Sequence, residues 1–223
     1  MTMEFTELLL NNRLFENIGK DRLEAALLFY DAHFAQYKKG DYLHIAGEAM
    51  HRFGVVLSGC VQALSDDIEG NRMIMANVTS GNSFGEALCY LKLPEPSVYI
   101  MASTDADIVW LSAEGLYGAG NDPLVNTLKR NFTALISIRT LQMNKRIQIL
   151  SKLTIRDKIL TFLSTMYGSD MGRSSERVVN IPMNREDMAA YIGTNRAALS
   201  RELSRMKSEG IIDYHKNKFI ILK

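Results

Sequence analysis

Between Pro123 and Leu153 the sequence contains neither glycine nor proline. Apolar residues recur there at intervals of three and four, which predicts an uninterrupted helix of about 30 residues and about 45 Å. The stripe comprises Val125, Leu128, Phe132, Leu135, Ile138, Leu141, Ile147 and Leu150. Such a helix either packs only on its own domain or pairs with the same helix of a second copy in a parallel seam. Its length favours the dimer.

The region before this helix consists of short apolar stretches separated by turn signals such as Ser58-Gly59 and Ser80-Gly81-Asn82. The expected strands are residues 42–45, 54–57, 72–75 and 107–111. Short strands at this spacing are typical of an antiparallel roll or sandwich. Residues 5–34 have helical spacing instead, which predicts one or two short helices that extend to about Phe34.

Charge is distributed unevenly along the 223 residues, although the net charge is only +1. Residues 1–153 contain 14 Lys and Arg against 17 Asp and Glu, whereas residues 154–223 contain 12 against 8. The length exceeds the roughly 100–150 residues of a common domain, so we expect two modest domains. A basic C-terminal domain is suited to a nucleic-acid partner.

Several other classes of protein lack their signatures in this sequence. No apolar run of about 18 residues is available to cross a membrane, and the acidic N-terminus does not resemble a secretory signal, so we expect a cytoplasmic protein. The two cysteines, Cys60 and Cys89, have no partner at metal-ligand spacing. We find no P-loop, dinucleotide turn or nucleophile–base pair, and we predict neither an enzyme nor a resident cofactor or metal.

The C-terminal segment reads as strand, helix, tight turn, helix and hairpin. Ahead of it, Thr154, with Asp157 three residues later, is expected to cap the N-terminus of a helix that runs to about Tyr167. Residues 184–192 form the first helix of the motif, Gly193 makes the turn, and the second helix runs from Arg196 to about residue 209. The hairpin of residues 211–222 then forms a wing.

The second helix of this motif is amphipathic. Leu199, Leu203 and Met206 share its apolar face. The opposite face comprises Arg196, Ala197, Ser200, Arg201, Ser204 and Lys207. Arginines that reach guanine edges, small residues that permit close approach and further cations for phosphates are what a helix in the major groove requires.

With these residues in place, the chain resembles the Crp/Fnr family, named for the cyclic-AMP receptor protein and the fumarate–nitrate regulator. The resemblance covers nearly all residues and is strongest over 188–201, MAAYIGTNRAALSR, against the family pattern (I/L)AxxxGxSRExxSR. It implies an α+β fold with an effector-sensing, double-stranded β-roll of the cupin-like jelly-roll type in residues 1–122. A dimerisation helix in 123–153 and a winged helix-turn-helix DNA-binding domain in 154–223 follow.

The same resemblance implies a homodimer that binds near-palindromic double-stranded DNA and contacts RNA polymerase. It places Arg196 and Arg201 at the two base-reading positions, and Ala197 replaces the acid that often follows the first arginine. The predicted DNA-binding residues are Asn184, Arg185, Thr194, Asn195, Arg196, Ala197, Ser200, Arg201, Lys207 and Lys216. A signal in the roll would act through a hinge near Leu153-Thr154.

Residues 83–88 resemble the start of the family's phosphate-binding cassette, in which a Glu holds the ribose and an Arg-Ser pair completes the site. The predicted effector-binding residues are Gly85, Glu86, Ala87, Ser97, Met143 and Asn144. Pro96 occupies the position of the cassette arginine, and only Lys92 stands nearby, which removes the clamp that a phosphodiester needs. We therefore expect an effector other than cyclic AMP; alternatively, Gly85 only turns the roll and Glu86 only caps a short helix.

Other sensing chemistries remain open. Haem would need a ligand such as His44 or His51, and an iron–sulfur cluster would need more cysteines than the two present. A redox response at Cys89 or the absence of any ligand is also compatible with the sequence. An apolar molecule bound in the roll would contact Leu88, Tyr90, Tyr99 and Met101. A cyclic-nucleotide-responsive regulator or sensing module is the alternative function.

Overall fold

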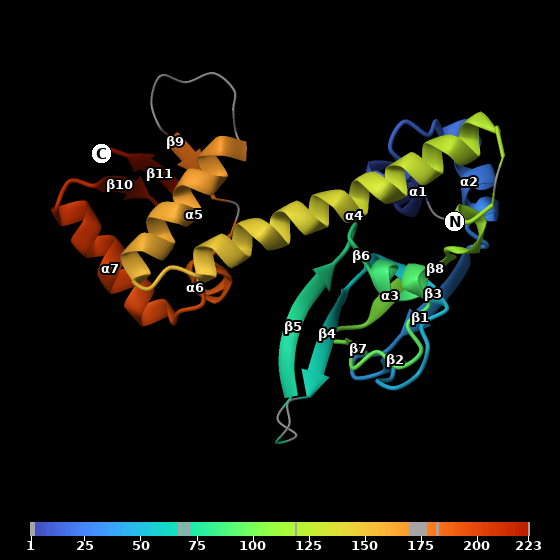
Figure 1. Cartoon of the computed structure of the whole chain (residues 1–223), viewed down its shortest axis with the longest axis horizontal. Helices are drawn as coiled ribbons and strands as arrows, with labels where there is room; N and C mark the ends of the chain where they lie inside the picture. Colours follow the sequence, from blue (N-terminus) through green and yellow to red (C-terminus); the bar gives the residue numbers. More distant parts are fainter. Residues whose placement is uncertain are drawn as a thin grey trace. The chain divides into compact units, whose positions relative to one another are not determined.

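The computed structural model describes residues 3–66, 69, 72–118, 120–169, 178–181 and 183–222 (Figure 1). The chain divides into two compact units, Met1–Ser137 and Ile138–Lys223. The boundary lies within the long helix α4, Pro123–Leu150. Its 28 residues are close to the predicted length of about 30 residues. In the part of the chain that is described, no helix is both long and apolar enough to cross a membrane.

The first unit contains two four-stranded antiparallel sheets, with strand orders β1-β8-β3-β6 and β2-β7-β4-β5. Its strands are β1 (His33–Tyr37), β2 (Tyr42–His44), β3 (Arg52–Ser58), β4 (Cys60–Asp66), β5 (Arg72–Thr79), β6 (Ser83–Phe84), β7 (Tyr99–Ala102) and β8 (Ala106–Ser112). Its helices are α1 (Met3–Asn11), α2 (Leu23–Phe29), α3 (Glu86–Leu91) and the 3-10 turns Arg13–Phe15, Lys20–Arg22 and Glu114–Leu116. The predicted α+β architecture with an N-terminal roll is confirmed.

The four expected strands are present, but the predicted helical stretch ends too late. Helix α2 stops at Phe29, and Phe34 lies in β1, opposite Val109 of β8. Asp31 adopts a positive φ of 46° between them and accepts hydrogen bonds from Arg52. A residue in the left-handed region cannot continue a helix, so the chain turns here and enters the sheet.

The first half of α4 packs onto the roll. Phe132 meets the ring of Phe53 with centroids 5.8 Å apart, and Leu128 is fully buried in the same core. Full burial of a side chain of this size contributes about 1.5–3 kcal/mol. Asn131 of the same half, itself buried, donates from Nδ2 to the carbonyl of Leu14 at 3.2 Å and to that of Glu16 at 2.7 Å. The first half of α4 thus packs on its own domain, which is one of the two arrangements that the sequence allows.

The second half of α4 has another environment. Its residues 140–148 are all exposed, and burial resumes only at Ile149, which belongs to the core of the second unit. Arg146 lies over the ring of Tyr191 at 5.4 Å, also within that unit. The last turn of α4 therefore belongs structurally to the C-terminal domain, ahead of the linker at residues 151–154.

The second unit is a winged helix-turn-helix. A three-stranded antiparallel sheet, ordered β10-β11-β9, accompanies three helices. The elements are α5 (Ile155–Ser169), β9 (Val178–Asn180), α6 (Arg185–Ile192), α7 (Arg196–Ser208), β10 (Ile212–His215) and β11 (Lys218–Ile221). As predicted, Thr154 caps α5: its Oγ1 accepts from the Asp157 N–H at 3.1 Å and donates to the Asp157 carboxylate at 2.7 Å.

Candidate nucleic-acid interface

Helices α6 and α7 begin close to the predicted residues because a side chain caps the N-terminus of each. Asn184 accepts from the backbone N–H of Asp187 at 2.8 Å, and Asn195 accepts from that of Ala198 at 2.8 Å. Each amide satisfies one N–H that the first helical turn leaves unbonded. Gly193 separates the helices with φ of 67°. Asn184 and Asn195, both in the predicted DNA-binding set, therefore have a structural role in the helix-turn-helix.

The apolar face of α7 is buried as the spacing predicts. Leu199, Leu203 and Met206 have at most 1% of their surface exposed, and they pack with Ile192 and Ala189 of α6. The opposite face is exposed and contains Arg196, Ala197, Ser200, Arg201 and Ser204. Burial of one face fixes the direction in which the other points, because a helix is rigid about its axis.

The wing is a hairpin with a two-residue turn. His215 of β10 pairs with Lys218 of β11, so Lys216 and Asn217 make the turn. Lys216 adopts φ of 52°, an unfavourable conformation for a residue with a side chain, and it is exposed. The turn thus presents a lysine at the tip of the hairpin.

Arg185, the first residue of α6, contacts the wing. Its Nη2 donates to the carbonyl of Lys216 at 2.6 Å. Its guanidinium lies 4.8 Å from the ring centroid of Phe219 and 5.5 Å from that of Tyr214. Partial burial lowers the pKa of Arg185, because the charged form loses water. The structure therefore places this predicted DNA-binding arginine against the wing.

Lys207 of α7 also contacts the wing. Its ammonium pairs with Asp213 at 2.5 Å, donates to the carbonyl of Tyr214 at 3.2 Å and lies 5.1 Å from the Tyr214 ring. The charge that the sequence suggested for phosphate is engaged within the domain. By contrast, across the described ranges, no carboxylate lies within ion-pair distance of Arg196 or Arg201.

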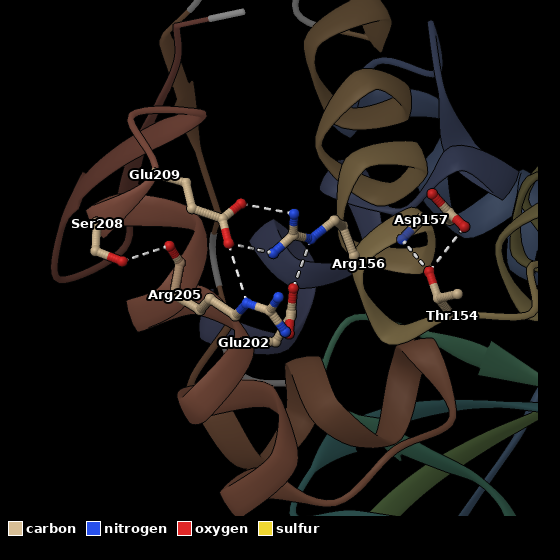
Figure 2. A network of polar contacts seen from close by, with 7 residues as sticks. All are labelled: Thr154, Arg156, Asp157, Glu202, Arg205, Ser208 and Glu209. Carbon is tan, nitrogen blue, oxygen red and sulfur yellow. Dashed lines mark hydrogen bonds and ion pairs between the residues drawn. The ribbon is translucent and has the colours of Figure 1, made fainter.

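Figure 2 shows a network that ties α7 to the start of α5. Arg156 donates from Nε to Glu202 at 2.7 Å and from Nη1 to Glu209 at 2.6 Å, and Glu209 also accepts from Arg205 at 3.0 Å. The bond from Arg156 lowers the pKa of Glu209. Sequence reasoning missed this network because the partners of Arg156 are 46 and 53 residues away in the chain. No local spacing rule indicates such a contact.

The phosphate-cassette resemblance falls at β6 and α3. Gly85 is the N-cap of α3 with φ of 80°, as expected for the residue that turns the chain. Glu86 is the first helical residue and is only 1% exposed, so the expectation that it caps α3 is wrong in position. Ala87 and Ser97 are exposed. Met143 and Asn144 lie on the exposed part of α4 in the second unit.

The position of the missing cassette arginine is occupied by a buried residue. Pro96 is buried, and its carbonyl accepts from the N–H of Gly47 at 3.0 Å. The neighbouring cation, Lys92, pairs with Glu114 at 2.9 Å and lies over the Tyr117 ring at 4.8 Å. The hydrogen bond with Glu114 raises the pKa of Lys92. Both observations argue against a phosphodiester clamp at this position.

The other sensing candidates occupy structural positions in the roll. Cys89 is buried, its thiol donates to the His51 carbonyl at 3.3 Å, and burial raises its pKa, which disfavours the reactive thiolate. His44 is buried, and burial lowers its pKa. Tyr90 stacks on Tyr117 with centroids 5.0 Å apart. Leu88, Tyr99 and Met101 are half-buried, and within the described residues no His, Cys, Asp and Glu cluster could hold a metal.

Comparison with known proteins identifies both domains. Residues 34–119 match the model of the cyclic nucleotide-binding domain, and residues 157–223 match that of the Crp-like helix-turn-helix domain. The chain is 21% identical to the cAMP-activated global transcriptional regulator CRP of Haemophilus influenzae over 85% of this chain and 84% of the relative.

Two solved structures share the fold. The catabolite activator protein of Thermus thermophilus matches with a TM-score of 0.53 and 20% identity, over 94% of this chain and 93% of that one. The c-di-GMP responsive global regulator CLP of Xanthomonas campestris matches with a TM-score of 0.55 and 16% identity, over 92% and 100%. The curated relative is a transcriptional regulator, which agrees with the prediction that the chain is not an enzyme.

Proposed function

Because the chain belongs to the Crp/Fnr family of DNA-binding transcription regulators, we propose that it binds near-palindromic duplex DNA as a homodimer and places α7 in the major groove. The observation that carries the proposal is the orientation of α7. Its apolar face is buried, and Arg196 and Arg201 extend from the exposed face without a carboxylate partner among the residues described. Free arginines on a rigid, capped helix suit base-edge recognition.

The exposed residues of the motif divide into two proposed roles. Arg196 and Arg201 read base edges, and a bidentate arginine–guanine pair contributes roughly 1–3 kcal/mol of discrimination. Ala197 and Ser200 permit close approach to the groove, and Thr194, with Asn184 and Asn195, lies at a helix N-terminus that suits phosphate. Lys216 at the wing tip supplies a phosphate contact.

The dimer seam is proposed to run along the second half of α4. Met143, Ile147 and Leu150 follow the 4-then-3 spacing of a coiled-coil seam, and they are 65%, 59% and 41% exposed in the single chain. Exposed apolar side chains in this pattern fit burial against the same helix of a second copy. Two recognition helices would then lie about one DNA turn, ~34 Å, apart.

We further propose that the roll responds to an effector other than cyclic AMP. A buried Pro96 and an ion-paired Lys92 support this, since they leave the cassette without a free cation for a phosphodiester. One similar protein is named as cAMP-activated and another as c-di-GMP responsive, so proteins similar to this chain do not all respond to the same nucleotide. Calorimetry with cyclic AMP is expected to give no binding heat, and tight binding would restore the cyclic-nucleotide alternative.

The proposed signal reaches DNA through α4. Ile149 lies in the C-terminal core and Arg146 contacts Tyr191, which supports a pivot before Arg146 rather than at the Leu153-Thr154 hinge that the sequence suggests. A two-state change there would bias the orientation of the DNA-binding domains. We also propose that the protein acts in the cytoplasm and contacts RNA polymerase.

The experiment that tests the function is selection of bound sequences from a random DNA pool without added ligand, followed by footprinting. We expect a two-fold symmetric site of roughly 14–22 base pairs, the length that two half-sites one turn apart require. No enrichment, either alone or with cyclic nucleotides and cell extract, would contradict the proposal.

A further inference from the structure

We propose that Arg185 is a positioning residue that fixes the wing turn and acts on DNA through Lys216 rather than through a phosphate contact of its own. This inference rests on the proposed DNA-binding function. It reassigns a residue that the sequence placed with the direct DNA contacts, and it follows from the surroundings of the Arg185 guanidinium.

The wing turn has a conformation that its residues do not favour by themselves. A β-hairpin with a two-residue turn needs a positive φ within the turn, and glycine or asparagine usually supplies it. In this chain Lys216 adopts that conformation, with φ of 52°. The carbonyl of Lys216 accepts the 2.6 Å bond from Arg185 Nη2, which holds the peptide unit after the lysine. Arg185 therefore stabilises a turn that the turn residue Lys216 does not favour.

Aromatic rings of the wing stack on the rest of the Arg185 guanidinium. It lies 4.8 Å from the Phe219 centroid and 5.5 Å from that of Tyr214, and these two rings are themselves 5.4 Å apart. Nη1 also lies 3.9 Å from the sulfur of Met188. Planar arginine is suited to such stacking, whereas lysine has neither the plane nor the fork of donors.

The wing is also held from the other helix. Lys207 of α7 bonds the Tyr214 carbonyl and lies over the same ring that faces Arg185. Cations from α6 and α7 thus both contact the same hairpin. Lys216 itself is exposed at the tip, and within the described part of the chain no acidic residue pairs with it. Lys216 is therefore a wing cation that remains available to a phosphate.

A double-mutant cycle tests the inference. Arg185→Gln, Lys216→Gln and the double variant are compared with the wild-type dimer on a random-sequence duplex of 30 base pairs at three salt concentrations. Log affinity falls linearly with log salt, and each lost phosphate contact reduces the magnitude of this negative slope by about 0.9. If Arg185 acts through Lys216, both single variants weaken binding, and the double variant binds within two-fold of Lys216→Gln with no further loss of slope.

Independent effects of the Arg185 and Lys216 variants would contradict the inference. If the two single effects multiply and the slope falls about twice as far in the double variant, Arg185 contacts phosphate itself and the inference is wrong. Lys152→Gln, in the linker before α5, is the matched control, and its effect should multiply with that of Lys216→Gln. Failure of the wild-type protein to bind any duplex would instead refute the proposed function and, with it, this inference.

Arg185→Lys separates geometry from charge. The variant keeps the positive charge but cannot stack on Phe219 while donating to the Lys216 carbonyl. We expect it to bind DNA as weakly as Arg185→Gln, with unchanged far-UV circular dichroism. Wild-type affinity in Arg185→Lys would show that only the charge matters, and it would overturn the assignment.

Discussion

The turn between α6 and α7 allows a prediction whose two energetic contributions can be separated. Gly193 has φ of 67°, and a Cβ at this position would lie 2.7 Å from Cδ2 of Leu150 in the last turn of α4. Gly210, after α7, has the same φ of 67°, but nothing lies within 4 Å of its hypothetical Cβ. Alanine at Gly210 therefore measures the cost of the backbone conformation, and alanine at Gly193 adds the contact with Leu150.

The magnitudes follow from these positions. A left-handed alanine costs about 1–2 kcal/mol, and the lower entropy of the unfolded chain offsets about 0.4–1 kcal/mol of that. Gly210→Ala should therefore destabilise the domain by roughly 0.5–1.5 kcal/mol. Moving the Leu150 side chain off its rotamer adds about 0.5–1.5 kcal/mol, so Gly193→Ala should cost roughly 1–3 kcal/mol. Leu150→Ala should remove the added part.

The stability of each unit is measured separately, by urea denaturation for the first unit and by hydrogen exchange for the second. The only tryptophan of the chain, Trp110, lies in β8 of the roll, so its fluorescence reports the first unit. Hydrogen exchange of α6 and α7 amides reports the second. We expect the exchange-derived stability to fall in both glycine variants while the Trp110 transition stays in place. Equal losses in Gly193→Ala and Gly210→Ala would refute the packing of α4 against the turn.

Two further outcomes follow from charges and exposed side chains. Because Arg156 lowers the pKa of Glu209, their bond should stabilise the folded domain fully above the carboxyl's unfolded pKa of about 4.3 and lose this effect as pH falls through the lower folded-state pKa. The urea midpoints of wild type and Arg156→Gln should therefore differ at pH 7 and converge in acid, once Glu209 is protonated in the folded state. A difference that stays constant with pH would exclude the pair as the cause. Ile147→Asp should raise the dimer dissociation constant about 100-fold or more in analytical ultracentrifugation, because it buries an unpaired charge in the proposed seam. The control Gln148→Asp, one residue off the stripe, should leave this constant unchanged. Similar dissociation constants for the two variants would contradict the seam.

Local sequence patterns predicted the elements that depend on local chemistry. The cap at Thr154, the turn at Gly193 and the buried face of α7 agree with the structure, because a few consecutive residues determine each of them. The end of the first helical region was predicted too late, since the turn at Asp31 depends on Arg52, a residue 21 positions away.

The roles of single cations were beyond such patterns. Arg185 and Lys207 look like DNA-contacting residues in the sequence, but the structure brings both to the wing, whose aromatic residues lie 29–34 and 7–12 positions later in the chain. The Arg156 network likewise joins residues from two helices. Whether an exposed-looking cation is free depends on tertiary packing, which periodicity does not encode.

Reading of DNA sequence by α7 through Arg201 is tested by comparing wild type with Arg201→Ala on two duplexes. One duplex carries the selected symmetric site and the other is random. We expect Arg201→Ala to lose about 1–3 kcal/mol, or roughly 5- to 150-fold in affinity, on the selected site, and two-fold or less on random DNA. Equal losses on both duplexes would contradict base reading by this helix.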